Sequence, residues 1–549
     1  MKKLGIVFVL LVLIGVLSQD GDPRPPHIVL VILDSVGRGD LFTAEDKMGY
    51  STPGFNKLVE TGAVLKNYYV QMQSSPTRAA LFTGRYPFKL GLQEQLVAGT
   101  TAHLPLNVPT LPELLKAAAE YQTHLVGGWG LGYASVEYTP TSRGFDTFFG
   151  YLGPEIDHIN KTRGRGFDFW DEVAGNPYSY RRPAWSAKGN YSTRLYKERT
   201  TSILQDYVKS HQTPSQQSKY PLFLTIAHQA MRGPLDGHPD HGSKCKKSSK
   251  ARKRYCNLMI ELDEAIAELR ANLVSLGLWD NTLLIVTSDS SSMVPLRGFD
   301  ENENPISPGS VGSNYPCRGS KTTLFEGGVR GVALVSGGKL DPQARGKSYE
   351  GLAHAVDAPV FILSSIFKSA TLSVRRALIE AMSEMDGVPL FELIGDKQSL
   401  LRFKAPRTEI PINVVSGGLD YSAIRYGRWK LIAGVSQEYR TGDGWWPASA
   451  EGPPQLPKAD RHRLFFVYKL YDLYTDPLER NNMVNLTEIV REGRARLRAI
   501  VNAGDYVEPQ LNLFNPLSFP FLHNGAWAPF LDDNGKPRFI DGEVDIARS

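Results

Sequence analysis

The run from His27 to Leu33 (HIVLVIL) limits the possible folds of this chain more than any other segment. Six consecutive aliphatic residues indicate a strand that is buried on both faces, as in a parallel sheet. The run stops at Asp34 and Ser35, so we expect it to deliver polar side chains at its carboxyl end. Similar apolar runs lie at 123–126, 221–226 and 282–287, between amphipathic patterns that predict helices at 53–61, 111–121, 256–276 and 373–385. Strands that alternate with helices predict an α/β fold with a large, mostly parallel sheet flanked by helices, in which ligands bind at the carboxyl ends of the strands.

The length and composition of the chain suit two domains. With 549 residues, 42% of them hydrophobic and 22% charged, bulk disorder and a small disulfide-bonded scaffold are both excluded. From about residue 411 the pattern changes to shorter alternating runs, such as 423–432 and 465–474. We therefore predict a larger α/β domain over 26–400 and a smaller antiparallel α+β domain over 411–549.

The N-terminus has the pattern of a secretory signal peptide over 1–18. Two lysines precede the apolar run from Leu4 to Leu17, which is shorter than the roughly 20 residues that a membrane-spanning helix needs. Three N-x-S/T sequons, at Asn160, Asn190 and Asn485, agree with a secreted route and predict glycosylation. We expect a protein of the secretory pathway, extracellular or lysosomal, with no membrane span.

One basic segment dominates the charge distribution. The formal net charge is +5, and the window 244–254 (KCKKSSKARKR) alone holds seven cations, including Lys246, Lys247 and Lys253. Such a run is commonly a solvated surface loop, and its functional interpretation is a patch that binds polyanions. In a secreted protein the available polyanions are sulfated glycans or anionic membrane surfaces, so we do not expect nucleic acid as a partner. Cys245 and Cys256 flank the run at a spacing that could close a disulfide, which would leave Cys317 unpaired.

Eight ordered segments resemble the sulfatase family, and within it the arylsulfatase B-like branch of the alkaline phosphatase-like superfamily. They are 26–40 (PHIVLVILDSVGRGD), 74–86 (SSPTRAALFTGRY), 127–132 (GGWGLG), 143–151 (RGFDTFFGY), 281–290 (NTLLIVTSDS), 318–331 (RGSKTTLFEGGVRG), 423–432 (AIRYGRWKLI) and 470–480 (LYDLYTDPLER). The resemblance implies the fold of that family. It also implies an enzyme that hydrolyses sulfate esters with a formylglycine, made from cysteine in C-x-P-x-R, beside one calcium ion.

Four site positions match what the resemblance implies. Asp34 and Asp289 correspond to metal carboxylates, Arg78 to the arginine of the nucleophile motif, and Lys321 to a lysine that contacts sulfate. Oxygen ligands suit a hard divalent cation, and cationic side chains neutralise the oxyanion.

Six other site positions depart from the family pattern. Serine replaces an aspartate, the cysteine to be oxidised and an asparagine, glycine replaces the lysine and the histidine of GKWHLG, and arginine replaces a second histidine. The residues are Ser35, Ser74, Ser290, Gly128, Gly130 and Arg232. Ser35 and Ser290 make poorer metal ligands, so we expect weakened calcium affinity. His228 and His238 lie close to Arg232 in the sequence and are candidates to replace the missing histidine.

The departures predict a degenerate site with weak or no turnover. Ser74 has one hydroxyl, so a sulfate ester formed on it would lack the second hydroxyl that releases sulfate. Arg232 adds a positive charge that favours anion binding. We expect sulfated glycans or small sulfate esters as ligands. Two alternatives remain open: an active hydrolase, with formylglycine made from Ser74 or with Ser74 attacking phosphate esters, or a non-catalytic interaction protein, with an oligomer through Cys317 as one form.

Overall fold

The computed structural model describes residues 24–41, 48–176, 178–180, 182–235, 241–245, 250–294, 311–367, 369–390, 393, 406–415, 421–434, 444–445 and 468–538. The predicted signal peptide, His238, Lys246 and Lys247 lie outside these residues.

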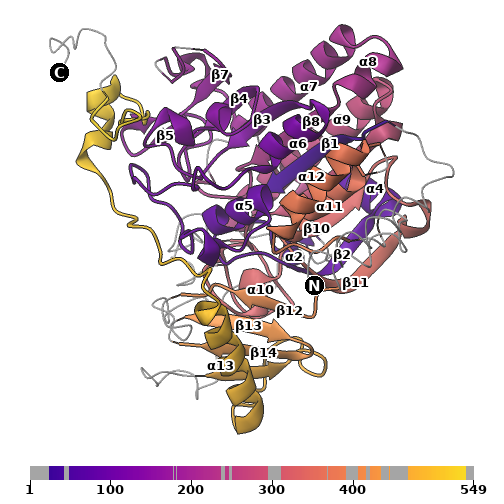
Figure 1. Cartoon of the computed structure of the whole chain (residues 1–549), viewed down its shortest axis with the longest axis vertical. Coiled ribbons are helices and arrows are strands. Elements are labelled where there is room, and N and C mark those ends of the chain that lie inside the picture. Colours follow the sequence, from indigo (N-terminus) through magenta and orange to yellow (C-terminus); the bar gives the residue numbers. More distant parts are fainter. Residues whose placement is uncertain are drawn as a thin grey trace.

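A nine-stranded, mostly parallel sheet forms the centre of the larger domain within the described residues (Figure 1). Its strands, in spatial order, are β11 (Lys347–His354), β2 (Ala63–Tyr69), β10 (Ala333–Ser336), β9 (Thr282–Ser288), β1 (His27–Leu33), β8 (Leu222–His228), β3 (Gln122–Gly128), β4 (Thr147–Tyr151) and β7 (Trp170–Val173). β1 pairs in parallel with β8 and β9, and its last residue, Leu33, lies beside His228 and Ser288. All seven residues of β1 are buried, which confirms the prediction of a buried parallel strand.

Helices cover both faces of this sheet because the side chains of β1 alternate between two hydrophobic cores. One core contains Ile28, Leu30 and Ile32 and lies under α5 (Ser74–Thr83), α6 (Leu111–Ala119), α11 (Asp357–Ser365) and α12 (Leu372–Ser383). The other contains Val29, Val31 and Leu33 and lies under α4 (Pro53–Thr61), α7 (Ser192–Ser210) and α9 (Lys250–Ser275). The remaining short elements of the larger domain are α2 (Arg38–Leu41), β5 (Thr162–Arg163), β6 (Gly166–Phe167), α8 (Pro214–Lys219) and α10 (Glu326–Val329). The four predicted helices are therefore present, although α9 begins six residues before the predicted start at Cys256.

The smaller domain is an antiparallel sheet with one long helix, as predicted. Its strands, in spatial order, are β12 (Glu409–Ile412), β13 (Ser422–Tyr426), β14 (Trp429–Ala433) and β15 (Lys469–Asp472), and α13 (Thr487–Asn502) packs on β13 and β14. Lys430 on β14 is fully buried and pairs with Glu326 on α10 at 2.9 Å and with Glu479 at 3.0 Å. This buried charge cluster joins the small sheet to the larger domain.

After α13 the chain returns to the larger domain. Residues 505–538, called the C-terminal arm below, follow α13 in sequence but run along the larger domain toward β5 (Figure 1). Isolated bridges join Phe514 to Thr100, Ala526 to Phe167 and Leu531 to Ser135. The arm therefore packs on the larger domain, and the boundaries at 400 and 411 stay a prediction.

Two of the three cysteines form a disulfide and the third is free. Cys245 and Cys256 form a disulfide, which confirms that pairing. Cys317 is free and buried, and burial raises the pKa of its thiol to about 11. A buried, protonated thiol is poorly placed for a bond to a second chain. Among the described residues, no helix is both long and apolar enough to cross a bilayer.

Candidate functional site

Four polar residues meet at the carboxyl ends of β1 and β9. Because these strands are parallel neighbours in register, Asp34 and Ser35 after β1 lie beside Asp289 and Ser290 after β9. The backbone N–H of Asp289 donates to the carbonyl of Leu33 at 3.0 Å, which fixes the two strand ends together. Ser35 Oγ donates to Asp34 Oδ1 at 2.8 Å, and Ser290 Oγ donates to Asp289 Oδ1 at 2.9 Å. All four residues are buried, so the predicted metal positions form one buried polar cluster, called the pocket below.

Ser74 enters this pocket from the first residue of α5. Its Oγ lies 3.4 Å from Asp34 Oδ1 and 3.4 Å from Ser290 Oγ. The backbone N–H groups of Ser74 and Ser75 both donate to Gln95 Oε1 at 3.1 Å. The amides at the start of a helix are anion-binding groups, and here the Gln95 side chain occupies them. No sequence pattern marks Gln95, which lies in a loop.

Arg78 stands one helical turn after Ser74 and joins three elements. Its Nε donates to Asp289 Oδ2 at 2.8 Å, and its Nη1 donates to the carbonyl of Gly128 at the end of β3. Burial alone lowers the pKa of Arg78, but the charge of Asp289 more than reverses this. The guanidinium therefore forms a buried ion pair with Asp289, and its two contacts connect α5 to the ends of β9 and β3.

Lys321 is the cation at the centre of the pocket. Its Nζ lies 3.1 Å from Asp34 Oδ1, 2.9 Å from Ser35 Oγ and 3.1 Å from Ser74 Oγ. The residue is only 5% exposed, so it is a pocket lysine and not an ordinary surface lysine. Burial lowers the pKa of Lys321, and the charge of Asp34 opposes that shift.

Arg232 faces the same pocket from the segment after β8, as its charge suggested. Its Nη1 lies 3.5 Å from Asp34 Oδ2, and its Nη2 pairs with Glu155 Oε2 at 2.6 Å. His158 Nε2 lies 2.8 Å from the backbone carbonyl of Arg232 and is fully buried. Burial alone raises the pKa of Asp34, but Lys321, Arg232 and Arg78 together hold it well below its usual value. Glu155 and His158 were not found from the sequence, since no motif marks either residue.

Tyr151 fills the space where a side chain at position 128 would begin. A Cβ built on Gly128 would lie 2.5 Å from Tyr151 Cζ and Oη and 2.8 Å from Arg78 Nη1. The Tyr151 hydroxyl is buried and has no hydrogen-bond partner among the described residues. A Cβ on Gly130, by contrast, would lie at ordinary contact distance, 3.7 Å from Arg78 Cδ, but Gly130 has a left-handed φ of +71°. Tyr151 therefore already occupies the space that a lysine at position 128 would need.

Comparison with known proteins agrees with this architecture. The sulfatase family model matches residues 26–369, which is more than half of the chain. The chain belongs to the sulfatase family. It is 29% identical to arylsulfatase J of Mus musculus over 558 residues, covering 95% of this chain and 85% of that protein. It is also 26% identical to arylsulfatase A of Homo sapiens, with 84% of each chain covered.

Solved structures share the sulfatase fold with this chain. The crystal structure of Ps i-CgsB in complex with k-i-k-neocarrahexaose superposes with a TM-score of 0.65 at 21% identity, covering 89% of this chain and 94% of that chain. The PsFucS1 sulfatase from Pseudoalteromonas sp. superposes with a TM-score of 0.62 at 20% identity, covering 92% and 94%. At these identities the match shows the fold, and the predicted fold class is confirmed.

Sulfatases typically bind a metal ion, and the donor set here does not fit calcium well. The four carboxylate and three hydroxyl oxygens of this pocket could supply the roughly six to eight ligands that calcium takes, but they carry only two negative charges, and ligand charge tunes calcium affinity. The cationic side chains already pair with the carboxylates, and the opposing charges balance. The cations are Lys321, Arg78 and Arg232, and the anions are Asp34, Asp289 and Glu155.

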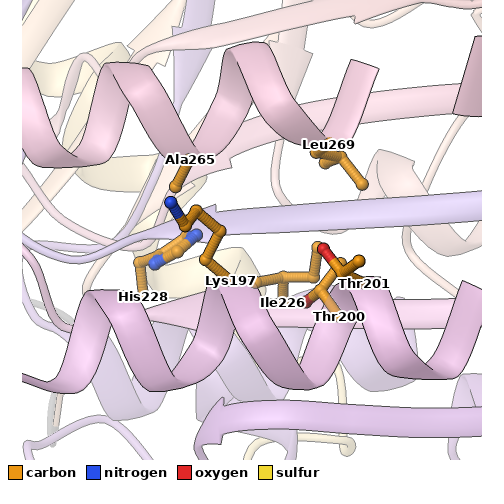
Figure 2. A pocket seen from close by; sticks show the side chains of 7 residues that line it. All are labelled: Lys197, Thr200, Thr201, Ile226, His228, Ala265 and Leu269. Carbon is orange, nitrogen blue, oxygen red and sulfur yellow. The ribbon is translucent and has the colours of Figure 1, made fainter. Parts of the chain in front are cut away.

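His228 lines a small cavity beside the sheet. Figure 2 shows its ring between α7 and α9. The cavity measures about 10 Å³, which leaves room for about one water molecule. It is lined by Lys197, Thr200, Thr201, Ile226, His228, Ala265 and Leu269. Burial lowers the pKa of His228 to about 4, so the ring is neutral at neutral pH. These surroundings are those of a core histidine.

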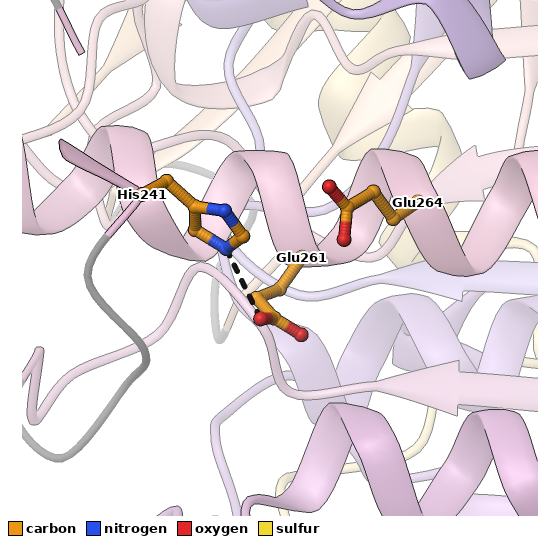
Figure 3. Close-up of side chains that lie close together, drawn as sticks. All are labelled: His241, Glu261 and Glu264. Carbon is orange, nitrogen blue, oxygen red and sulfur yellow. Dashed lines mark hydrogen bonds and ion pairs between the residues drawn. The ribbon is translucent and has the colours of Figure 1, made fainter. Parts of the chain in front are cut away.

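A second group of potential metal ligands lies on α9. His241 Nε2 is 3.0 Å from Glu261 Oε1, and Glu264 stands one turn further along the helix (Figure 3). Arg194 already donates to both oxygens of Glu261, and Lys244 pairs with Glu264 at 3.1 Å. These basic partners neutralise the two carboxylates, so the group is explained as an ion-pair network.

The basic run divides into parts with different roles. Lys244 pairs with Glu264, and α9 begins at Lys250. Arg252 is 6% exposed and donates to Asp40 Oδ1 at 2.8 Å, so it belongs to the interior and not to a solvated loop. Lys253 is half-buried on the same helix. The interpretation of 244–254 as a uniformly solvated loop is therefore wrong at Arg252.

The three predicted glycosylation sites are all on the surface. Asn160, Asn190 and Asn485 are exposed. Exposure is required for a glycan, and occupancy stays a prediction.

Proposed function

We propose that this sulfatase-family protein binds sulfate esters, with sulfated glycans as its ligand class, and turns them over weakly or not at all. The observation that carries the proposal is the state of position 74. A serine with a single hydroxyl stands at the start of α5, and it accepts a hydrogen bond from Lys321 at 3.1 Å.

The chemistry of a lone hydroxyl supports slow turnover. Attack by Ser74 Oγ on a sulfate ester would form a new S–O bond and release the alcohol of the substrate. The resulting serine sulfate has no second hydroxyl whose loss of a proton could expel the sulfate. Glycine at positions 128 and 130, where the family resemblance implies lysine and histidine, offers no side chain that could donate a proton to the leaving alcohol.

Anion binding is supported by the cations around the pocket and by the relatives. Arg232 and Lys321 face Asp34 from two sides. One similar structure was solved in complex with k-i-k-neocarrahexaose. One relative, 29% identical over 58% of this chain, is the N-acetylgalactosamine-6-sulfatase of Homo sapiens. We extend this ligand class to the present chain and include Lys246, Lys247 and Lys253 as contacts for the polyanion.

The test combines the mass of the peptide that contains Ser74 with sulfate release. Protein secreted from cultured eukaryotic cells is digested, and the peptide is weighed, since conversion of serine to formylglycine removes two hydrogen atoms. We expect unmodified Ser74, retention on a column of sulfated glycan, and little sulfate release from aryl sulfates. Robust sulfate release that Ser74→Ala abolishes would refute the proposal.

A second function is an active hydrolase that uses Ser74. It is favoured by the S-x-P-x-R sequence from Ser74 to Arg78 and by the contact between Ser74 Oγ and Lys321 Nζ. In this case Ser74 becomes formylglycine and cleaves sulfate esters, or its hydroxyl attacks phosphate esters directly. The same peptide mass separates the first form, and release of phosphate from a phosphate ester identifies the second.

The cysteines and the sequons bear on the cellular location of the protein. The disulfide between Cys245 and Cys256 and the exposed sequons support passage through the secretory pathway. We propose an extracellular or lysosomal location. A non-catalytic interaction role is the remaining alternative, and the burial of Cys317 argues against an intermolecular disulfide as its basis.

A further inference from the structure

We propose that the ammonium group of Lys321 is the resident cation of this pocket, and that it takes the role that a metal ion has in the sulfatase family. The protein would then fold and bind its ligand without calcium. This inference goes beyond the proposed function, because a pocket formed without a divalent cation suits a binding protein and a slow hydrolase alike.

The contacts of Lys321 Nζ are those of a bound cation. Three oxygen atoms surround it at 2.9 to 3.1 Å: Asp34 Oδ1, Ser35 Oγ and Ser74 Oγ. Two of them follow β1 and the third begins α5, so the amine joins one of the two strand ends that carry the predicted metal positions to the helix that carries Ser74. Each of these residues is almost completely buried.

The number and direction of these contacts match an ammonium group. An ammonium has three N–H donors and no acceptor, so three oxygens satisfy it completely. Ser35 Oγ donates its own hydrogen to Asp34 Oδ1 at 2.8 Å, which leaves its lone pairs for Lys321. Nitrogen-to-oxygen hydrogen bonds have lengths of about 2.7 to 3.2 Å, whereas calcium requires contacts of about 2.3 to 2.6 Å to six or more oxygens.

The charge balance also favours one monovalent cation. Arg78 binds Asp289, and Arg232 lies between Asp34 and Glu155. Lys321 supplies the remaining positive charge, so three cations face three anions. A calcium ion added to this set would leave two uncompensated positive charges in a buried pocket, which is unfavourable.

The backbone on both sides holds Lys321 in position. Its N–H donates to the carbonyl of Ser292, after β9, at 3.1 Å. The next residue, Thr322, donates to the carbonyl of Met72, just before α5, at 3.0 Å and has a left-handed φ of +74°. The amine is thus delivered from a fixed segment that spans β9 and α5.

The experiment compares the wild-type protein with Lys321→Met, a variant that keeps an unbranched side chain, one heavy atom shorter, but removes the charge. Melting temperature and bound calcium are measured after dialysis into EDTA and again after addition of millimolar calcium. We expect the wild-type protein to hold no calcium and to melt at the same temperature in both buffers. We expect Lys321→Met to melt on the order of 5 °C lower in EDTA, because Asp34 loses its partner, and to regain part of this in calcium.

Lys57→Met is the matched control, because its side chain is exposed and pairs only with Glu60 on the surface. It should melt like the wild-type protein in both buffers. The proposal is overturned if the wild-type protein retains about one calcium per chain, or if EDTA lowers its melting temperature. It is also overturned if Lys321→Met folds and shows no calcium dependence, because the lysine then does not exclude the metal.

A second measurement covers the case in which Lys321→Met does not fold. The wild-type protein is treated with an amine-methylating reagent in EDTA and in calcium, and the labelling of Lys321 is read by peptide mass. Equal protection in both buffers supports the proposal, and labelling that rises with calcium overturns it. Sulfate release enters none of these readouts, so failure of the proposed function and failure of this inference are distinguishable.

Discussion

Ser35 has a backbone conformation that is unusual for a serine. Its φ is +61°, a region that asparagine and aspartate enter more readily. The family resemblance places an aspartate here. The turn is held by Ser292, whose Oγ donates to the carbonyl of Ser35 at 2.9 Å and accepts the N–H of Gly37 at 2.8 Å. The turn that would present a carboxylate at this position is therefore in place and carries a serine hydroxyl.

Gly128 and Tyr151 give a prediction at the same scale. We expect Gly128→Ala to destabilise the protein by about 1–3 kcal/mol, because the new Cβ would lie 2.5 Å from the Tyr151 ring and must displace it. A second substitution, Tyr151→Ala, removes the clash with the ring and leaves only the 2.8 Å approach to Arg78 Nη1. The measurement is a double-mutant cycle on the free energy of unfolding from urea denaturation.

In this cycle, Gly128→Ala should cost much less in the Tyr151→Ala background than in the wild-type background. Equal costs in the two backgrounds would show that the ring does not occupy the space of the missing side chain. Gly128→Lys alone should likewise not create a sulfatase site, because the Tyr151 ring occupies the space next to position 128.

At the scale of helices and strands, the sequence was most informative where local pattern and burial coincide. The apolar run of β1 and its polar end at Asp34 were predictable, because a parallel strand is buried along its length and ends at the ligand edge of the sheet. The pocket around Asp289 followed for the same reason. The place of Lys321 in the pocket follows from the resemblance alone, because no local pattern predicts its burial.

The remaining site residues could not be found because distant loops supply them. Gln95, Glu155 and His158 have no periodic pattern and reach the pocket only through tertiary packing. The interior role of Arg252 was missed because its partner, Asp40, lies 212 positions earlier in the chain. A run of like charges therefore indicates a solvated segment only while no distant anion binds one of its members.

The first turn of α9 gives a prediction for this basic run. Asp40 is fully buried and accepts hydrogen bonds from Arg252, Tyr255 and the backbone N–H of Ser313. Arg252→Met leaves Asp40 without its cation, so we expect a loss of about 3–5 kcal/mol of stability. The neighbouring Lys253→Met is the matched variant, and it should cost less than about 1 kcal/mol.

Heparin binding should rank these two variants in the opposite order, with the larger effect for Lys253→Met. If the run binds polyanions, Lys253→Met should elute from a heparin column at lower salt than the wild-type protein. Arg252→Met, where it folds, should elute close to the wild-type position because its charge already faces Asp40. A larger shift for Arg252 than for Lys253 would contradict this division of the run.

At the scale of the whole molecule, the C-terminal arm connects the far end of the chain to the start of α5. Gln510 Oε1 accepts the N–H of His103 at 3.0 Å, and its Nε2 donates to the carbonyl of His103 at 2.8 Å. Asn512 Nδ2 donates to the carbonyl of Gln95 at 2.7 Å. Because Gln95 holds the first amides of α5, the arm supports the pocket through a single intermediate residue.

Removal of the arm should therefore loosen the pocket without removing any residue from it. We compare a chain that ends at Gly504 with a control that ends at Arg538, and we follow amide hydrogen exchange by mass spectrometry. The shorter chain should exchange faster at 95–103 and in the first turn of α5, while β1 keeps its protection because it is hydrogen-bonded between β8 and β9 inside the large sheet. Should the shorter chain aggregate, Asn512→Ala tests the same link, since it removes the contact to Gln95 and leaves the arm in place. Unchanged exchange at the start of α5 in the folded variant would mean that Gln95 is held by its own loop, and that the arm serves only to cover the larger domain.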